Sequence, residues 1–142
     1  MDEKLKQLYQ SVILKHNQSP INYEKKEDAA IKIEAYNPLC GDQFKLFMET
    51  EGDVVKSIHF HGYGCAISKA STSILVKKIA GKKIEEVEQL LQEYFDMLES
   101  GEAHPDEELE AFAAAKSFPG RIQCATLSWE SLQKWLKEKD LP

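Results

Sequence analysis

The residues of this sequence best suited to chemistry are its three cysteines, Cys40, Cys65 and Cys124. Thiolates are nucleophiles and metal ligands, and three of them with one carboxylate would complete a tetrahedral zinc site. Asp42, two residues after Cys40, can supply that carboxylate. An odd number of cysteines in a chain with no export signal favours reduced thiols over a disulfide framework. We therefore expect metal binding or sulfur chemistry at these positions.

Two of the cysteines lie in glycine-containing segments, Leu39 to Asp42 and Gly62 to Cys65. Such segments are typical of turns, where the backbone is pliable and thiols are accessible. The competing interpretation is that each cysteine packs as a small buried hydrophobic residue, which is the commoner role of a free cysteine. No compact C-x-x-C pair is present. The metal hypothesis therefore depends on whether the fold brings the three cysteines together.

The elements that must position these residues can be predicted from hydrophobic periodicity. Alternating apolar residues predict three strands in the first half of the chain: Ile31 to Tyr36, Gln43 to Thr50, and Val54 to His61 after a turn at Glu51 to Asp53. Helical spacing predicts a helix ending at Asn17 to Pro20, one from Cys65 to Gly81, one from Ile84 to Leu98, a short one from Pro105 to about Lys116, and a last one opened by Pro119. Strands grouped early and helices grouped late predict an α+β fold, in which helices cover one face of a three-stranded antiparallel sheet. We expect a single domain over residues 1–142.

An antiparallel meander of these strands would place Cys40, Asp42 and Cys65 at one end of the sheet. Cys65 would then lie at the N-terminus of the helix that follows. Cys124 lies within the last helix, beside or opposite a core stripe that includes Ala125 and Trp129. Spacing alone leaves open whether Cys124 reaches the same point.

Composition narrows the classes of partner. The formal net charge is −6 and the pI is near 5.3, without the basic stripe that nucleic acids or anionic membranes require. No stretch approaches transmembrane length. We expect a cytoplasmic protein that binds neither nucleic acid nor membrane.

Several motifs together resemble a known family. Three features are similar to the IscU and SufU proteins of iron-sulfur cluster assembly: the segment Asn37 to Asp42, the segment Gly62 to Ser68, and Cys124 in the last helix. Cys65 of the second segment follows Cys40 after 24 intervening residues. The resemblance covers nearly the whole chain. It implies the α+β fold described above, and it implies that Cys40, Asp42, Cys65 and Cys124 are metal ligands.

Two departures from the IscU branch resemble the SufU branch. Gln123 stands where IscU proteins have a histidine before the last cysteine, and the segment around Pro105 to Lys116 lengthens the spacing between Cys65 and Cys124. Resemblance to SufU implies one zinc ion per chain and a zinc-dependent sulfurtransferase. Its partners would be a SufS-type cysteine desulfurase, which supplies sulfur, and downstream iron-sulfur scaffold proteins, which receive it.

The mechanistic hypothesis assigns the sulfur to Cys40. Docking to the desulfurase would offer zinc a replacement ligand, and the freed Cys40 thiolate would attack the persulfide of the enzyme. Arg121, three residues before Cys124, would pair with Asp42 or with the persulfide during exchange. The competing interpretation of Arg121 is a solvated surface cation.

Two other functions remain open. The first is a scaffold on which a transient iron-sulfur cluster forms on the same thiolates, although Gln123 argues against it. The second is a structural zinc module, in which the metal only holds the sheet to the last helix.

The remaining histidines and tryptophans are expected to be structural. His59 and His61 approach Cys65 along a strand, but we do not expect them to be ligands. His16 and His104 lie at predicted helix boundaries, where we expect caps or exposed side chains, and Asp106 to Glu110 favours a helix start. Trp129 and Trp135 are predicted to pack in the core.

Overall fold

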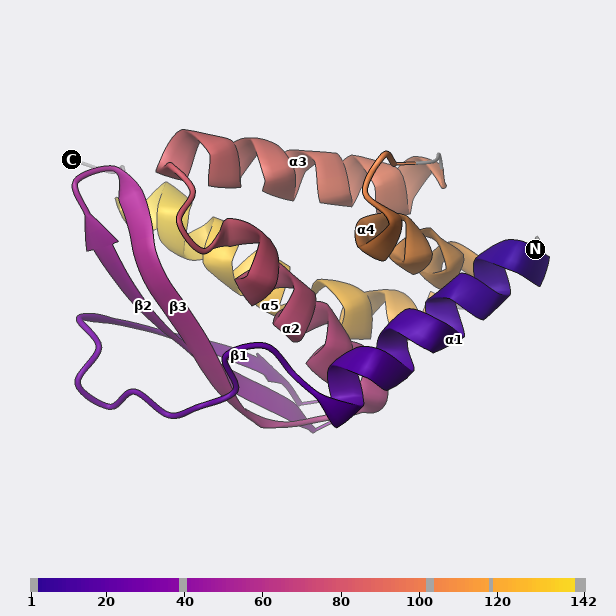
Figure 1. Cartoon of the computed structure of the whole chain (residues 1–142), viewed down its shortest axis with the longest axis horizontal. Helices are drawn as coiled ribbons and strands as arrows, with labels where there is room; N and C mark the ends of the chain where they lie inside the picture. The colour runs from indigo at the N-terminus through magenta and orange to yellow at the C-terminus, as the bar shows by residue number, and fades with distance from the viewer. Residues whose placement is uncertain (1–2, 39–40, 102–103, 118, 140–142) are drawn as a thin grey trace.

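A twisted sheet forms one side of the molecule, and the helices stack over one of its faces (Figure 1). This computed structural model describes residues 3–38, 41–101, 104–117 and 119–139. Cys40, the proposed sulfur acceptor, lies outside the described residues.

The sheet has three antiparallel strands in the order β1-β2-β3, and these are β1 (Ile31–Asn37), β2 (Asp42–Glu51) and β3 (Val54–Tyr63). Its register aligns Ile33, Leu46 and Phe60 across the sheet. All three side chains are buried on the helix-covered face, as the period of two requires. The predicted meander is therefore confirmed, with β2 and β3 slightly longer than the sequence pattern indicated.

The helical elements are α1 (Glu3–Gln18), α2 (Ala66–Ile79), α3 (Ile84–Ser100), α4 (Glu107–Ala111), the 3₁₀ helix η1 (Phe112–Ser117) and α5 (Pro119–Lys139). Helix α1 ends just before Ser19-Pro20, because proline cannot continue a helix. Helix α3 ends at Gly101, which takes a left-handed conformation with φ 77°, a common helix stop. The predicted α+β fold is confirmed.

Helices α2 and α5 lie directly on the sheet, with α1 beside α2 and α3 on the side of α5 away from the sheet (Figure 1). Helix α2 is buried on nearly every side, which explains its weak amphipathicity. Trp129 of α5 lies in the same core, stacked on Tyr94 of α3 at a centroid distance of 3.7 Å. No helix in the described ranges is long and apolar enough to cross a bilayer.

The segment before α5 differs from its prediction. A single helix to about Lys116 was expected, but α4 ends at Ala111 and tightens into the 3₁₀ helix η1. The five residues Ala111 to Ala115 are all buried, which one face of an amphipathic α-helix cannot achieve. Short 3₁₀ turns of this kind are common connectors between helices.

His16 corrects a second expectation, because its side chain is fully buried and not exposed at a helix end. Its Nδ1 atom lies 2.7 Å from the Ser73 hydroxyl on α2, and its Nε2 atom lies 2.5 Å from a carboxylate oxygen of Glu108 on α4. The other carboxylate oxygen of Glu108 accepts from Lys77 at 2.6 Å. The ring therefore joins α1, α2 and α4. His104 meets the expectation of a cap, since its Nδ1 accepts the N–H of Asp106.

Candidate metal centre

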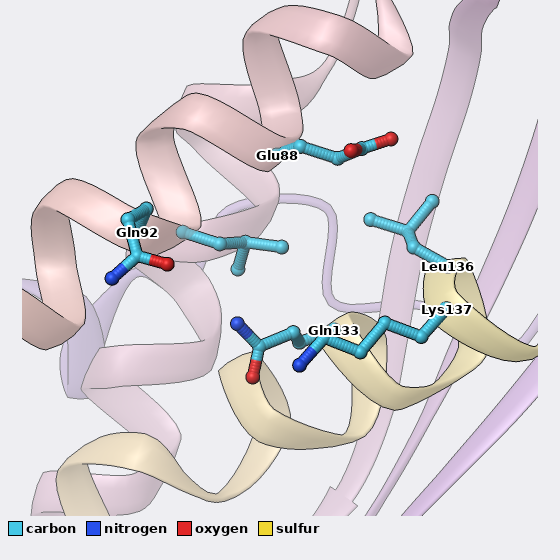
Figure 2. Close-up of a pocket in the computed structure, with 6 residues that line it drawn as sticks. Glu88, Gln92, Gln133, Leu136 and Lys137 are labelled. Atoms are coloured by element: carbon cyan, nitrogen blue, oxygen red, sulfur yellow. The ribbon is translucent and has the colours of Figure 1, made fainter.

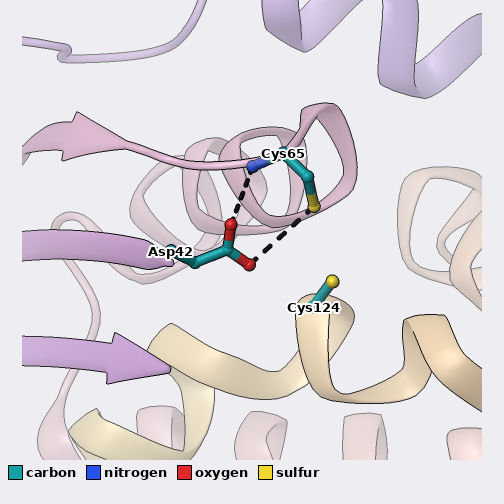
Figure 3. Close-up of side chains that lie close together, drawn as sticks. All are labelled: Asp42, Cys65 and Cys124. Atoms are coloured by element: carbon teal, nitrogen blue, oxygen red, sulfur yellow. Dashed lines mark hydrogen bonds between the residues drawn. The ribbon is translucent and has the colours of Figure 1, made fainter. Parts of the chain in front are cut away.

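Asp42, Cys65 and Cys124 meet where the sheet end adjoins helices α2 and α5 (Figure 3). Their potential ligand atoms all lie within 4.8 Å of one another. Asp42 and Cys124 are buried, at 1% and 3% exposure, while Cys65 is partly exposed. The trio is thus shielded from water on most sides and open at Cys65.

Asp42 is the first residue of β2 and pairs in register with Asn37, the last residue of β1. Its Oδ1 atom accepts the backbone N–H of Cys65 at 2.8 Å, and its Oδ2 atom lies 3.9 Å from the Cys65 sulfur. Figure 3 shows the carboxylate turned so that one oxygen meets the backbone and the other faces the thiols. The hydrogen bond therefore fixes the orientation of this potential ligand.

Cys65 is the N-cap of α2, and its sulfur accepts the N–H of Ser68 at 3.4 Å. The sulfur therefore lies at the positive end of the α2 helix dipole. The prediction that Cys65 lies at a helix N-terminus is confirmed.

Two glycines before Cys65 allow the close approach of β3 to β2. A Cβ on Gly62, whose φ is 149°, would lie 2.1 Å from the backbone oxygen of Gln43. A Cβ on Gly64 would lie 2.7 Å from Asp42 Oδ1 and 2.8 Å from the Phe44 ring. Side chains at these two positions would therefore push Cys65 away from Asp42.

Cys124 reaches the same point because α5 is firmly joined to α2. The Ser71 hydroxyl of α2 donates to the backbone oxygen of Ala125 at 2.6 Å and accepts from Trp129 Nε1 at 2.9 Å. A second buried contact, 2.7 Å between the hydroxyls of Thr72 and Ser128, lies one turn further along α5. These bonds answer the question that spacing left open, and they place Cys124 beside Cys65.

Arg121 is exposed on the first turn of α5, three residues before Cys124. At this spacing the two residues lie on nearly the same side of the helix. Its cationic head is therefore available to solvent or to a partner beside the trio.

Tyr9 of α1 is a neighbour of the site that sequence reasoning missed. Burial, together with the nearby Cys124 and Cys65, raises the pKa of its phenol to about 12, while Arg121 acts in the opposite direction. Tyr9 therefore remains a neutral hydrogen-bond donor at physiological pH. In the sequence it was only one member of an apolar helical stripe, so no signal distinguished it.

The histidines of β3 do not join this group. Among the described residues, Asp42, Cys65 and Cys124 form the only cluster able to hold a metal ion. The His61 ring instead stacks on Tyr23 at a centroid distance of 4.7 Å. His59 and His61 therefore lie outside the cluster that the described residues form.

A separate groove of about 140 Å³ lies between α3 and α5 (Figure 2). Its lining residues are Glu88, Leu91, Gln92, Gln133, Leu136 and Lys137. Gln133 lies nine residues beyond Cys124, about 14 Å along a helix. The groove is therefore remote from Asp42, Cys65 and Cys124, and its lining residues form no metal-binding cluster among the described residues.

The donor set of the trio suits zinc, which binds cysteine sulfur and carboxylate oxygen and is four-coordinate in most protein sites. Two thiolates and a carboxylate so close together, and mostly buried, would repel one another strongly without a cation. The described residues therefore fit three positions of such a centre.

Comparison with known proteins gives a consistent picture. Residues 8–134 match the family model described as the NifU-like N terminal domain. The chain is 36% identical over 137 residues to the zinc-dependent sulfurtransferase SufU of Bacillus subtilis, covering 94% of this chain and 92% of that one. It is 33% identical over 140 residues to the iron-sulfur cluster assembly scaffold protein IscU of Thermotoga maritima, covering 96% and 98%.

Solved structures show the same fold. The crystal structure of FiSufU from Fervidobacterium islandicum AW-1 superposes with a TM-score of 0.81 at 29% identity, covering 89% of this chain and 95% of that one. The N-terminal NifU-like protein of Brucella abortus superposes with a TM-score of 0.83 at 15% identity, covering 96% and 99%, and that likeness concerns the fold alone. The resemblance drawn from the cysteine motifs is thus confirmed, and the chain belongs to the NifU-like N-terminal domain family, which includes the SufU and IscU proteins.

Proposed function

We propose that this protein is a zinc-dependent sulfur acceptor of iron-sulfur cluster biogenesis. Cys40, Asp42, Cys65 and Cys124 would hold one zinc ion per chain, and Cys40 would receive sulfur from a SufS-type cysteine desulfurase and pass it to downstream scaffold proteins. The observation that carries the proposal is the convergence of Asp42, Cys65 and Cys124 within 4.8 Å.

The position of Cys40 in the sequence supports its role as the fourth ligand. It lies in the short connection between Asn37 and Asp42, which are register partners at the end of the sheet. Because that connection spans only four residues, a ligand supplied from it is compatible with a site at the end of β2 that carries Asp42.

The two described thiols, Cys65 and Cys124, are both held by regular structure. Cys65 is tied to a helix start and Cys124 lies buried within a helix, so movement of either sulfur would disturb regular structure. We therefore assign the resident ligation to Cys65 and Cys124, and the transferable sulfur to Cys40, the remaining cysteine ligand that the resemblance implies.

Bound zinc would keep the thiols as thiolates at neutral pH. In the transfer step the Cys40 thiolate attacks the outer sulfur of the desulfurase persulfide, forming a new S–S bond on Cys40. The bond between the two sulfurs of the enzyme breaks, and its cysteine leaves as a thiolate. No net oxidation occurs, and we assign to exposed Arg121 the role of a cation that pairs with Asp42 or with the persulfide during exchange.

The names of the relatives support two candidate functions. One relative is named a zinc-dependent sulfurtransferase and others are named scaffold proteins. Gln123, in the position before Cys124 where IscU proteins have a histidine, favours the sulfurtransferase. The scaffold function, with a transient cluster on the same thiolates, is the second candidate because thiolates also ligate iron-sulfur clusters.

The test compares Cys40→Ser with the unaltered protein in two assays, zinc content and acceleration of a SufS-type desulfurase. We expect about one zinc per chain in the unaltered protein and loss of acceleration in Cys40→Ser. Asp42→Ala is the matched control, because it removes a proposed ligand and retains every thiol. Normal acceleration by Cys40→Ser would refute the assignment of the sulfur to Cys40, and isolation with iron and labile sulfide would favour the scaffold function.

A further inference from the structure

The Ser68 hydroxyl is a buried polar group with no hydrogen-bond partner in the part of the chain that the structure describes. Its residue is 1% exposed and lies in the first turn of α2, three residues after Cys65. Buried hydroxyls are nearly always paired, so an unpaired one calls for an explanation. The neighbouring buried serines Ser71 and Ser73 both have partners.

The reason for the missing partner lies in how the helix start is capped. In a capping box, a Glu or Gln three residues after the N-cap accepts the backbone N–H of the N-cap residue. Here Asp42 Oδ1 takes the N–H of Cys65 at 2.8 Å. The Asp42 carboxylate therefore performs the role that a Glu or Gln at position 68 would have, and the Ser68 hydroxyl has no part in the cap.

The Ser68 hydroxyl and the Asp42 carboxylate converge on Gly64. A Cβ built on Gly64 would lie 2.7 Å from Asp42 Oδ1 and 3.0 Å from Ser68 Oγ. Since Gly64 has no side chain, nothing on that residue separates the two oxygens. A hydroxyl donates one hydrogen bond, and a carboxylate oxygen can accept more than one.

We propose that Ser68 is a positioning residue for the metal centre, whose hydroxyl donates to Asp42 Oδ1 when a metal ion is bound. The two donors, Cys65 N–H and Ser68 O–H, then hold Oδ1 and direct Oδ2 to the metal. Carboxylate ligands in metal sites are commonly oriented by such hydrogen bonds. This inference rests on the proposed function only in requiring that Asp42 bind the metal.

The proposal predicts a separation between metal affinity and stability. Since the hydroxyl has no partner in the fold described, Ser68→Ala should leave the Tm of the metal-free protein unchanged or higher. It should weaken metal binding about tenfold, the lower end of the effect of losing a partner of a metal ligand. A merely structural serine would behave in the opposite way.

Ser71→Ala is the matched control, because Ser71 is a similarly buried serine on the same helix. Its hydroxyl, unlike that of Ser68, both donates and accepts a hydrogen bond. We expect Ser71→Ala to lower the Tm of the metal-free protein by about 4 °C with little change in metal affinity.

The experiment measures Zn²⁺ and Co²⁺ affinity by competition with a chromophoric chelator, together with the Tm with and without metal. It compares the unaltered protein, Ser68→Ala, Ser71→Ala, Asp42→Ala and the Asp42→Ala/Ser68→Ala double variant. If Ser68 acts through Asp42, its substitution should change affinity less than twofold in the Asp42→Ala background.

Two results would overturn the inference while leaving the proposed function intact: an unchanged metal affinity in Ser68→Ala, or a full tenfold effect that persists without Asp42. Failure of the unaltered protein to bind either metal would instead refute the proposed zinc site itself, and with it the role of Ser68.

Discussion

The backbone N–H of Cys65 donates to Oδ1 of Asp42 at 2.8 Å, so one carboxylate both caps helix α2 and faces the two thiols. The start of β2 and the start of α2 are thereby joined before any metal binds. Removal of the whole Asp42 side chain group should therefore affect stability and metal binding together.

Asp42→Ala should lower the free energy of unfolding of the metal-free protein by about 1 kcal/mol, the usual effect of removing a helix cap. Asp42→Asn retains an oxygen acceptor for the Cys65 N–H, so most of that stability should remain, while the lost charge weakens metal binding. Urea unfolding and chelator competition measure the two effects. Equal urea midpoints for Asp42→Ala and the unaltered protein would contradict the capping role.

Gly64→Ala should disrupt the centre through steric overlap. The new methyl group would approach Asp42 Oδ1 and the Phe44 ring within 2.8 Å, and such overpacking costs about 1–3 kcal/mol. We expect a lower Tm and loss of zinc from the purified protein. Gly52→Asn is the control, since Gly52 has φ 63° in open space and asparagine tolerates that conformation. Full zinc content in Gly64→Ala would show that the close approach is unimportant.

Glu108 should contribute to the loss of folding stability at low pH. Lys77, His16 and Lys78 lower the pKa of Glu108 from 4.5 to about 2, although burial acts in the opposite direction. A depressed carboxylate pKa contributes stability that is complete above the unfolded-state value and is lost as pH falls through the folded-state value. We therefore expect this contribution to disappear between about pH 4.5 and pH 2.

The variant that tests this account is Glu108→Gln. It should lose about 2 kcal/mol at pH 7, because buried His16 and the partners Lys77 and Lys78 lose a carboxylate, and its urea midpoint should fall less steeply below pH 4.5. Glu107→Gln, which changes an exposed neighbouring carboxylate, should retain the full acid dependence. Parallel pH curves for Glu108→Gln and the unaltered protein would disprove the assignment.

Arg121→Ala should slow sulfur acceptance without lowering the stability of the fold. Because Arg121 is exposed, its removal should change the free energy of unfolding by less than about 0.5 kcal/mol. The rate of sulfur acceptance should fall several-fold if the cation offsets charge beside Asp42. Lys134→Ala, an exposed cation on the same helix, serves as the control for general charge effects. An unchanged rate in Arg121→Ala would return Arg121 to the role of a solvated surface residue.

The sheet and most helices could be predicted because their signals are local. The alternation around Ile33 and Leu46 fixes which face of each strand is buried, and Pro20 and Gly101 mark helix ends. The approach of Asp42 to Cys65 also follows from a short meander. These features require only the geometry of consecutive segments.

The position of Cys124 depends on contacts between distant segments. It is set by the bonds of Ser71 to Ala125 and Trp129, which no spacing rule reveals. The same limit explains why Tyr9, Ser68 and buried His16 were missed, since their significance depends on which elements pack around them.

The central claim is tested most directly by the intact mass of the zinc-loaded protein after incubation with a SufS-type desulfurase and cysteine, without added reductant, followed by peptide mapping. The proposal predicts about one zinc per chain beforehand and a gain of one or more sulfur atoms that maps to Cys40. Zinc retained with no sulfur gained, or sulfur found only on Cys65 or Cys124, would contradict it.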